Sequence, residues 1–169
     1  MGTETVSRFE SSLGSIDVPL TRTDRDGFAS ALNEIVTEPA VGVPLDGVDG
    51  VSLAETVVQT PPTPRLLQEA ETGVTPVRKG IARYGSLAVE SDEQGSELVS
   101  LYPPTHVAVL RERDVLQDVD ASLGYLEERF GEGGSTVFAT GVSATGDMGA
   151  LIEGVHGPRD VHVLLVTER

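Results

Sequence analysis

A short apolar run, VHVLLV at residues 161–166, restricts the fold of this chain more than any other feature of its sequence. The run follows directly on a turn rich in glycine and proline, residues 154–160. Runs of this length that are rich in β-branched residues and bounded by turn residues are typical of buried strands. A second such run, residues 135–139, is followed by a polar loop, residues 141–147. Two polar loops are therefore expected just outside β-strands, where α/β proteins usually bind ligands.

Segments with the apolar spacing of helices alternate with strand-length runs along much of the chain. This alternation predicts an α/β fold with a mainly parallel sheet, helices on both of its faces, and an N-terminal helical extension. In the longest helix, residues 116–130, the residues expected to face inward are Leu116, Val119, Leu123, Leu126 and Phe130. The other expected helices are 3–13, 24–36, 64–70, 77–82 and a short turn at 147–152; the other expected strands are 40–43, 86–89, 97–101 and 107–110.

The length of 169 residues suits a single domain with a core of its own, residues 1–169. Residues 1–72 are expected to form a helical N-terminal part, and residues 73–169 hold the denser strand pattern. No apolar run is long enough for a transmembrane helix. Residues 1–15 lack the apolar core of a signal peptide, so we expect a cytoplasmic protein that does not bind membranes.

The formal net charge is −15, and Lys79 is the only lysine. A basic groove for nucleic acid is therefore not expected. The simplest interpretation of the acidity is a solvated surface. A sharper one is adaptation to a high-salt cytoplasm, where the Debye length falls to about 3 Å at 1 M salt. The near-absence of lysine and the few aromatic residues resemble proteins of halophilic archaea. An acidic surface that docks a basic partner is the alternative.

The chain contains no cysteine. Disulfides, a thiolate zinc site, a thiol nucleophile and a cysteine-ligated iron–sulfur cluster within this chain are therefore excluded, and no cofactor is expected. The spacing of the three histidines does not match a metal-binding motif, so no metal site is expected. His106 and His162 occupy strand positions and are interpreted as structural histidines, each hydrogen-bonded within the sheet.

Several stretches resemble the LUD domain of the lactate utilization protein C family in both order and spacing. They are residues 73–75, 85–87, 98–101 followed by Pro103 and Pro104, 106–109, 140–147 and 154–158. The resemblance covers residues 73–166, a little over half of the chain. It implies the fold of the group that contains ribose-5-phosphate isomerase, glucosamine-phosphate deaminase and CoA-transferase. It also implies a part in the oxidation of L-lactate to pyruvate, beside two iron–sulfur partner proteins.

The sequence departs from the family pattern at two acidic positions. Where the family usually has Ala-Glu-Thr-Gly-Thr, this chain has an arginine, Arg83, in place of the glutamate. The Asp-Ile-Glu that usually follows the later loop is replaced by Asp147, Met148 and Gly149. If those glutamates act chemically in relatives, this chain lacks both of them. A diverged or non-catalytic relative is therefore one hypothesis.

A small anion is the expected ligand. Backbone N–H groups in the loop 141–147 and the dipole of a following helix favour a phosphate or carboxylate. Arg159 is suited to grip a carboxylate at two points, and His156 to transfer a proton. The plain alternative is that a side chain of the loop only caps a helix and that His156 only shapes its turn. The candidate ligand-binding residues are Gly85, Ser86, Gly141, Ser143, Thr145, Asp147, His156 and Arg159.

Three functions remain open from the sequence. The first is an accessory component of an L-lactate oxidation system that binds a small anion and iron–sulfur partner subunits. The second is an enzyme that acts alone on a sugar phosphate or an acyl-CoA. The third is a non-catalytic interaction module with a vestigial cleft. Catalytic residues are not assigned, and self-association as a homo-oligomer is left open.

Overall fold

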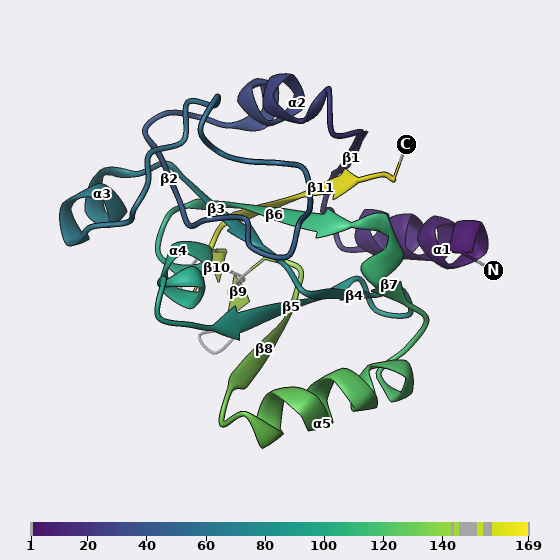
Figure 1. The fold of residues 1–169 in the computed structure, drawn as a ribbon. Coiled ribbons are helices and arrows are strands. Elements are labelled where there is room, and N and C mark those ends of the chain that lie inside the picture. The colour runs from purple at the N-terminus through teal and green to yellow at the C-terminus, as the bar shows by residue number, and fades with distance from the viewer. Residues whose placement is uncertain (1, 143, 146–151, 154–156, 169) are drawn as a thin grey trace.

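The computed structural model describes residues 2–142, 144–145, 152–153 and 157–168 (Figure 1). A five-stranded sheet forms its centre, and all four of its strand pairs are parallel. The strand order is β1-β11-β6-β3-β2. The bounds in that order are Leu20–Thr23, Asp160–Val166, Thr105–Arg111, Thr72–Pro76 and Ala40–Gly42. The predicted parallel sheet is confirmed, and its two outer strands come from the N-terminal part. Residues 1–72 are therefore more than a helical extension.

The alternation of side chains along β6 and β11 divides the core between the two faces of this sheet. Ala108 and Leu110 pack on one face with α1 (Gly2–Ser15), which buries Val6, Phe9 and Leu13 against them. The other face carries side chains such as Val107 and Val109. It is covered by α2 (Phe28–Ile35) and by the extended segment that follows β2. α4 also packs on β3, on the same face as α1, so helices lie on both faces as expected.

A second, mixed sheet shares the α1 face, and the sequence does not predict it. Its strand order is β7-β4-β5-β8, with bounds Val115–Leu116, Lys79–Ile81, Ser86–Ser91 and Ser135–Thr140. The predicted helix at 77–82 is wrong, because β4 occupies this segment and pairs antiparallel with β5. The antiparallel pair returns through Gly85, whose φ of +70° is a conformation that glycine adopts without strain.

The predicted strand at 97–101 is also wrong, because α4 (Ser96–Leu101) occupies this segment. The carboxylate of Asp92 holds the start of α4: Oδ1 accepts from the backbone N–H of Ser96 at 3.0 Å. Its Oδ2 accepts from the Ser96 hydroxyl at 2.5 Å. The acidic turn before α4 therefore satisfies backbone donors that the first turn of a helix leaves free.

The predicted helix at 116–130 is confirmed only from Leu123, where α5 (Leu123–Gly131) begins. Before it lie β7 and two short 3₁₀ helices, Glu112–Asp114 and Asp120–Ser122. The predicted inward face of α5 is wrong, because the side chains of Leu123 and Phe130 are 56% and 58% exposed. Tyr125 and Arg129 contact the second sheet instead.

One further helix and two short strands complete the described chain. The helix α3 (Pro64–Glu69) begins with a proline, and Thr63 caps it by accepting from the N–H of Leu66 at 3.2 Å. The strands β9 (Ala144–Thr145) and β10 (Ile152–Glu153) pair antiparallel. The predicted helical turn at 147–152 is wrong at Ile152, and its other residues lie outside the described part of the chain.

Candidate functional site

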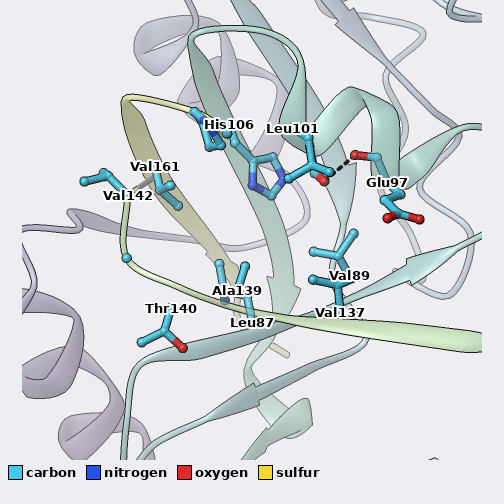
Figure 2. Close-up of a pocket in the computed structure, with 14 residues that line it drawn as sticks. Leu87, Val89, Glu97, Leu101, His106, Val137, Ala139, Thr140, Val142 and Val161 are labelled. Carbon is cyan, nitrogen blue, oxygen red and sulfur yellow. Dashed lines mark hydrogen bonds between the residues drawn. The ribbon is translucent and has the colours of Figure 1, made fainter. Parts of the chain in front are cut away.

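A pocket of about 190 Å³ lies between the two sheets (Figure 2). The volume is enough for a ligand the size of one small ring, because engineered cavities of about 150 Å³ accept benzene. Most of its walls are apolar, contributed by Leu87, Val89, Leu101, Val137, Ala139, Val142, Pro158 and Val161. The polar side chains that reach it are Glu97, Ser100, His106 and Thr140. An apolar pocket with a few polar groups is the usual form of a small-molecule site.

The pairing of β5 with β8 builds one wall of this pocket. Leu87 lies opposite Ala139, and Val89 lies opposite Val137. Residues directly opposite in an antiparallel pair share one face, so these four side chains line the pocket together. The alternate residues of both strands point to the other face, towards α5. The pocket wall therefore results from the period of two along residues 86–91 and 135–140.

His106 is one of the polar residues that line the pocket. Its side chain is 2% exposed, and its Nε2 lies 2.9 Å from the Thr75 hydroxyl on the neighbouring strand β3. Burial lowers the pKa of His106 to about 4, so its imidazole is neutral at physiological pH. The prediction of a hydrogen-bonded sheet histidine is confirmed, but sequence reasoning missed that this residue also lines the pocket.

The other polar groups of the pocket have partners within the fold. The Ser91 hydroxyl donates to Glu97, and the Ser100 hydroxyl donates to the Glu97 carbonyl at 2.7 Å. The hydroxyls of Thr140 and Ser86 lie 2.6 Å apart. Among the described lining residues there is no lysine or arginine. The described walls therefore offer hydrogen bonds to a ligand but no cationic side chain.

The structure brings only some of the predicted site residues to this pocket. Gly141 lines it, and Ser86 adjoins it through its contact with Thr140. Gly85 lies elsewhere, against Leu13 and Ile16 at the end of α1.

The remaining candidates lie outside the described lining. Arg159 is exposed, and its backbone N–H donates to the Pro104 carbonyl at 2.8 Å. Thr145 belongs to β9. Ser143, Asp147 and His156 lie outside the described residues. The predicted loops do flank the pocket at 141–142 and 157–158. The alternating strands 86–91 and 135–140 were the sequence signal that could have found its wall.

The burial of His106 predicts how the stability of the fold depends on pH. The unfolded chain takes up a proton on this residue below pH 6.5, whereas the folded chain does so only below about pH 4. Protons therefore favour the unfolded state in between, and lowering the pH from 6.5 to 4 should cost about 3 kcal/mol at this site. His106→Gln should lose that part of the pH dependence, measured by urea denaturation at pH 7 and pH 4.5.

His162→Gln is the matched control for that measurement. His162 is half-buried, lies 2.8 Å from the Thr21 hydroxyl through Nε2, and has a pKa that burial also lowers. Because this residue is more exposed, its replacement should remove less of the pH dependence. An unchanged pH dependence in His106→Gln would contradict the expectation.

Comparisons with known proteins extend the resemblance beyond residues 73–166. The sequence profile of the LUD domain family matches residues 8–166. Lactate utilization protein C of Deinococcus radiodurans is 31% identical over 102 residues, which cover 59% of this chain and 48% of that protein. The protein of the same name from a Geobacillus species is 26% identical over 107 residues, covering 60% and 44%. The chain therefore spans less than half the length of these curated relatives.

A solved structure is similar over almost the whole chain. The crystal structure of a DUF162 family protein from Deinococcus radiodurans superposes with a TM-score of 0.77. The match covers 98% of both chains at 22% sequence identity, so it supports the fold alone. In the described part of the chain, no helix has both the length and the apolar character that crossing a membrane requires.

Proposed function

The chain belongs to the LUD domain family, and we propose that it serves lactate utilization as an accessory component that binds a small carboxylate. The distant homology to lactate utilization protein C supports the lactate-related role. The observation that carries the binding role is the pocket between the two sheets, with its apolar walls and its neutral histidine.

The chemistry of the pocket determines how such a ligand would lie. A carboxylate buried among apolar side chains without a cation is costly. We therefore place the charged end of the ligand at the mouth, beside Gly141 and Gly157, and its apolar end against the wall of β5 and β8. His106 then offers a hydrogen bond to a hydroxyl or carbonyl oxygen on the ligand. A 2-hydroxy or 2-oxo acid of few carbons fits this description.

The pocket favours this ligand class over a sugar phosphate. Sugar phosphates expose hydroxyl groups over most of their surface and carry a dianion, whereas the described walls are mainly apolar and hold no arginine or lysine. The position where the family usually has a glutamate holds Arg83, which is exposed and lies over the ring of Tyr84 at 5.5 Å. Arg83 does not line the pocket. These features favour ligand binding over turnover by this chain alone.

A larger side chain that fills the pocket tests the binding role. Ala139→Leu adds three carbon atoms on the pocket face of β8 and should weaken the binding of L-lactate or pyruvate at least tenfold. Calorimetric titration in molar KCl measures this effect. Ala121→Leu, at an exposed position, is the matched control and should bind as the unmodified chain does. Equal affinity in both variants, or no heat from the unmodified chain, would overturn this binding site.

Iron–sulfur partner subunits are the second part of the proposal. The chain has no cysteine to ligate a cluster, so electrons from lactate would pass through a partner. Tagged chain purified from its native cells at high salt should retain iron–sulfur proteins and lactate-dependent dye reduction. A chain that elutes without them would remove the accessory role, and turnover of an acyl-CoA by the isolated chain would favour an enzyme.

A further inference from the structure

The helix α5 exposes the apolar side of its surface. Its side chains Leu123, Leu126 and Phe130 share one stripe of the helix, because they are three and four residues apart. Leu123 and Phe130 are more than half exposed. The side chains that meet the second sheet, Tyr125 and Arg129, are polar. An amphipathic helix that points its apolar stripe to solvent marks a surface that another molecule covers.

The strand β8 lies beside this helix at the edge of the second sheet (Figure 1). β5 pairs with all six residues of β8 on one side. On its other side, β8 has no partner among the described strands. Exposed edges are normally protected by charged residues, proline or a bulge. The sequence of β8, STVFAT, contains no charge and no proline, and Phe138 and Val137 are partly exposed.

The apolar stripe and the free edge point in the same direction. Glu128 of α5 and Glu132, which directly follows the helix, line a polar cavity with Arg78, which directly precedes β4. This flank of α5 therefore faces the β4 side of the sheet. Successive residues of a helix are about 100° apart, so Leu126 and Phe130 lie on the opposite flank. That flank faces past β8, where the sheet ends.

We propose that a second copy of this chain covers this surface, through antiparallel pairing of β8 with β8 about a twofold axis at Phe138. This register is self-complementary: Phe138 lies opposite itself, Thr136 opposite Thr140, and Val137 opposite Ala139. Paired strands lie about 4.8 Å apart. The two α5 helices then lie side by side across the axis, where helices pack about 8–10 Å apart. Their apolar stripes form the contact between them.

The distribution of charge determines where on the surface a second copy can approach. Two chains of net charge −15 repel each other over most of their surface. β8 carries no charge, and Glu128 and Glu132 line the cavity on the flank that faces away from the axis. Glu127 is exposed and lies beside the apolar stripe, because it is four residues after Leu123. The uncharged edge is therefore a place where two copies approach with little repulsion. Salt screens what repulsion remains, so association should strengthen with KCl concentration.

Sedimentation of the full chain in molar KCl tests this proposal. The unmodified chain should sediment with twice its mass of 17.8 kDa. Phe130→Glu places a charge in the helix contact and should raise the dimer dissociation constant at least 100-fold without changing the circular dichroism. Leu98→Glu on α4 is the matched control, since Leu98 is also 58% exposed and apolar. This control should remain a dimer.

Three outcomes would overturn the proposal: a monomeric unmodified chain, a dimeric Phe130→Glu, or a Leu98→Glu that dissociates equally. A complex with an unrelated protein in place of self-association would also do so. Oxidation gives a second measurement, because the chain has no cysteine of its own. Phe138→Cys should form a disulfide-linked dimer much faster than Leu98→Cys, and equal rates would contradict the proposed axis.

Discussion

Replacing Gly73 by alanine is expected to lower the free energy of unfolding by about 3 kcal/mol or more. Gly73 lies in β3, an inner strand of the parallel sheet between β6 and β2, and α4 packs directly on this strand. A Cβ atom at this position would lie 2.1 Å from the Val99 carbonyl oxygen and 3.1 Å from Pro103 Cγ. The carbonyl oxygen belongs to the backbone of α4, so the whole helix would have to move.

The displacement of α4 should also disturb the pocket, because Glu97, Ser100 and Leu101 line it from this helix. Urea denaturation measures the stability effect. Gly124→Ala is the matched control, since no atom lies within 4 Å of a Cβ at that position in α5. It should stabilise the fold by about 0.5–1 kcal/mol. Similar stability of the two variants would contradict the close packing of α4 on β3.

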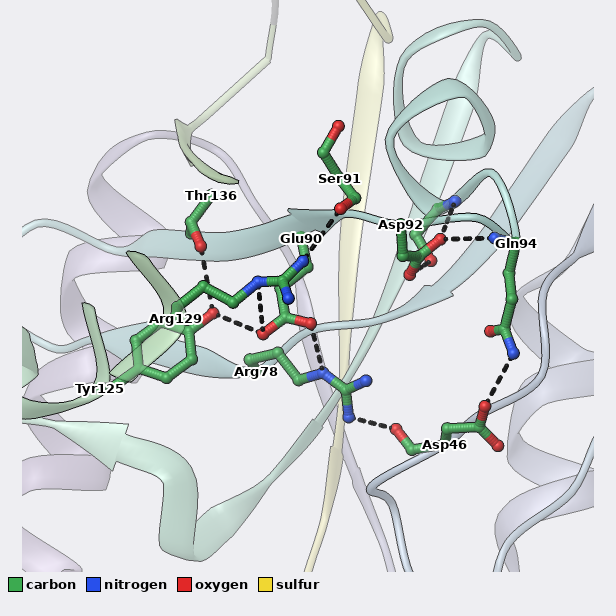
Figure 3. Close-up of polar contacts among 10 residues, drawn as sticks. Asp46, Arg78, Glu90, Ser91, Asp92, Gln94, Tyr125, Arg129 and Thr136 are labelled. Atoms are coloured by element: carbon green, nitrogen blue, oxygen red, sulfur yellow. Dashed lines mark hydrogen bonds and ion pairs between the residues drawn. The ribbon is translucent and has the colours of Figure 1, made fainter. Parts of the chain in front are cut away.

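Replacing Glu90 by alanine is expected to cost about 3–5 kcal/mol, the second large effect. Its carboxylate is 14% exposed and lies on the α5 face of the second sheet (Figure 3). Oε2 accepts from Arg78 Nε at 3.2 Å, and Oε1 accepts from the Tyr125 hydroxyl at 2.9 Å. Oε1 also lies 3.6 Å from Arg129 Nε, a buried atom without a hydrogen-bond partner. Removing the Glu90 carboxylate leaves the positive charge of Arg129 without this counterion.

Burial is the main reason why the pKa of Tyr125 is raised to about 12. Its hydroxyl therefore stays protonated and donates to Glu90 throughout the neutral pH range. Denaturation of Glu90→Ala and Glu90→Gln measures the contribution of the carboxylate. The control is Glu69→Gln, which breaks the exposed Arg65–Glu69 pair and should cost about 0.5 kcal/mol or less. A loss below about 1 kcal/mol in Glu90→Ala would show that the charges are solvated.

The sequence predicts the central strands and misassigns the segments that are only half apolar. The runs at 107–110 and 161–166 lie in strands buried on both faces, and their content of valine favours a strand over a helix. Residues 97–101, ELVSL, are only partly apolar, and so short a segment fits a strand and a helix equally well. The Asp92 side chain decides in favour of a helix by bonding to Ser96. That bond depends on a turn whose geometry the sequence pattern does not contain.

The candidate site was predicted in part for a similar reason. Glycine and polar residues in loops are visible in a sequence, and Gly141 does line the pocket. The apolar wall depends on which strands pair, and the pairing of β5 with β8 joins segments about fifty residues apart. His106 looked like a sheet residue because it is one. That His106 also lines the pocket follows only from the second sheet, which packs opposite it.

The strand order also limits when this protein completes its fold during synthesis. β11, the last of the described strands, lies between β1 and β6 (Figure 1). Among the described strands, β1 pairs with β11 alone. Residues 20–23 therefore cannot pair with a neighbouring strand until residues 160–166 have left the ribosome. Such long-range pairing slows folding, because the intervening chain loses conformational entropy before the stabilising contacts form. Until then, the side of β6 that β11 covers in the complete sheet has no strand to pair with.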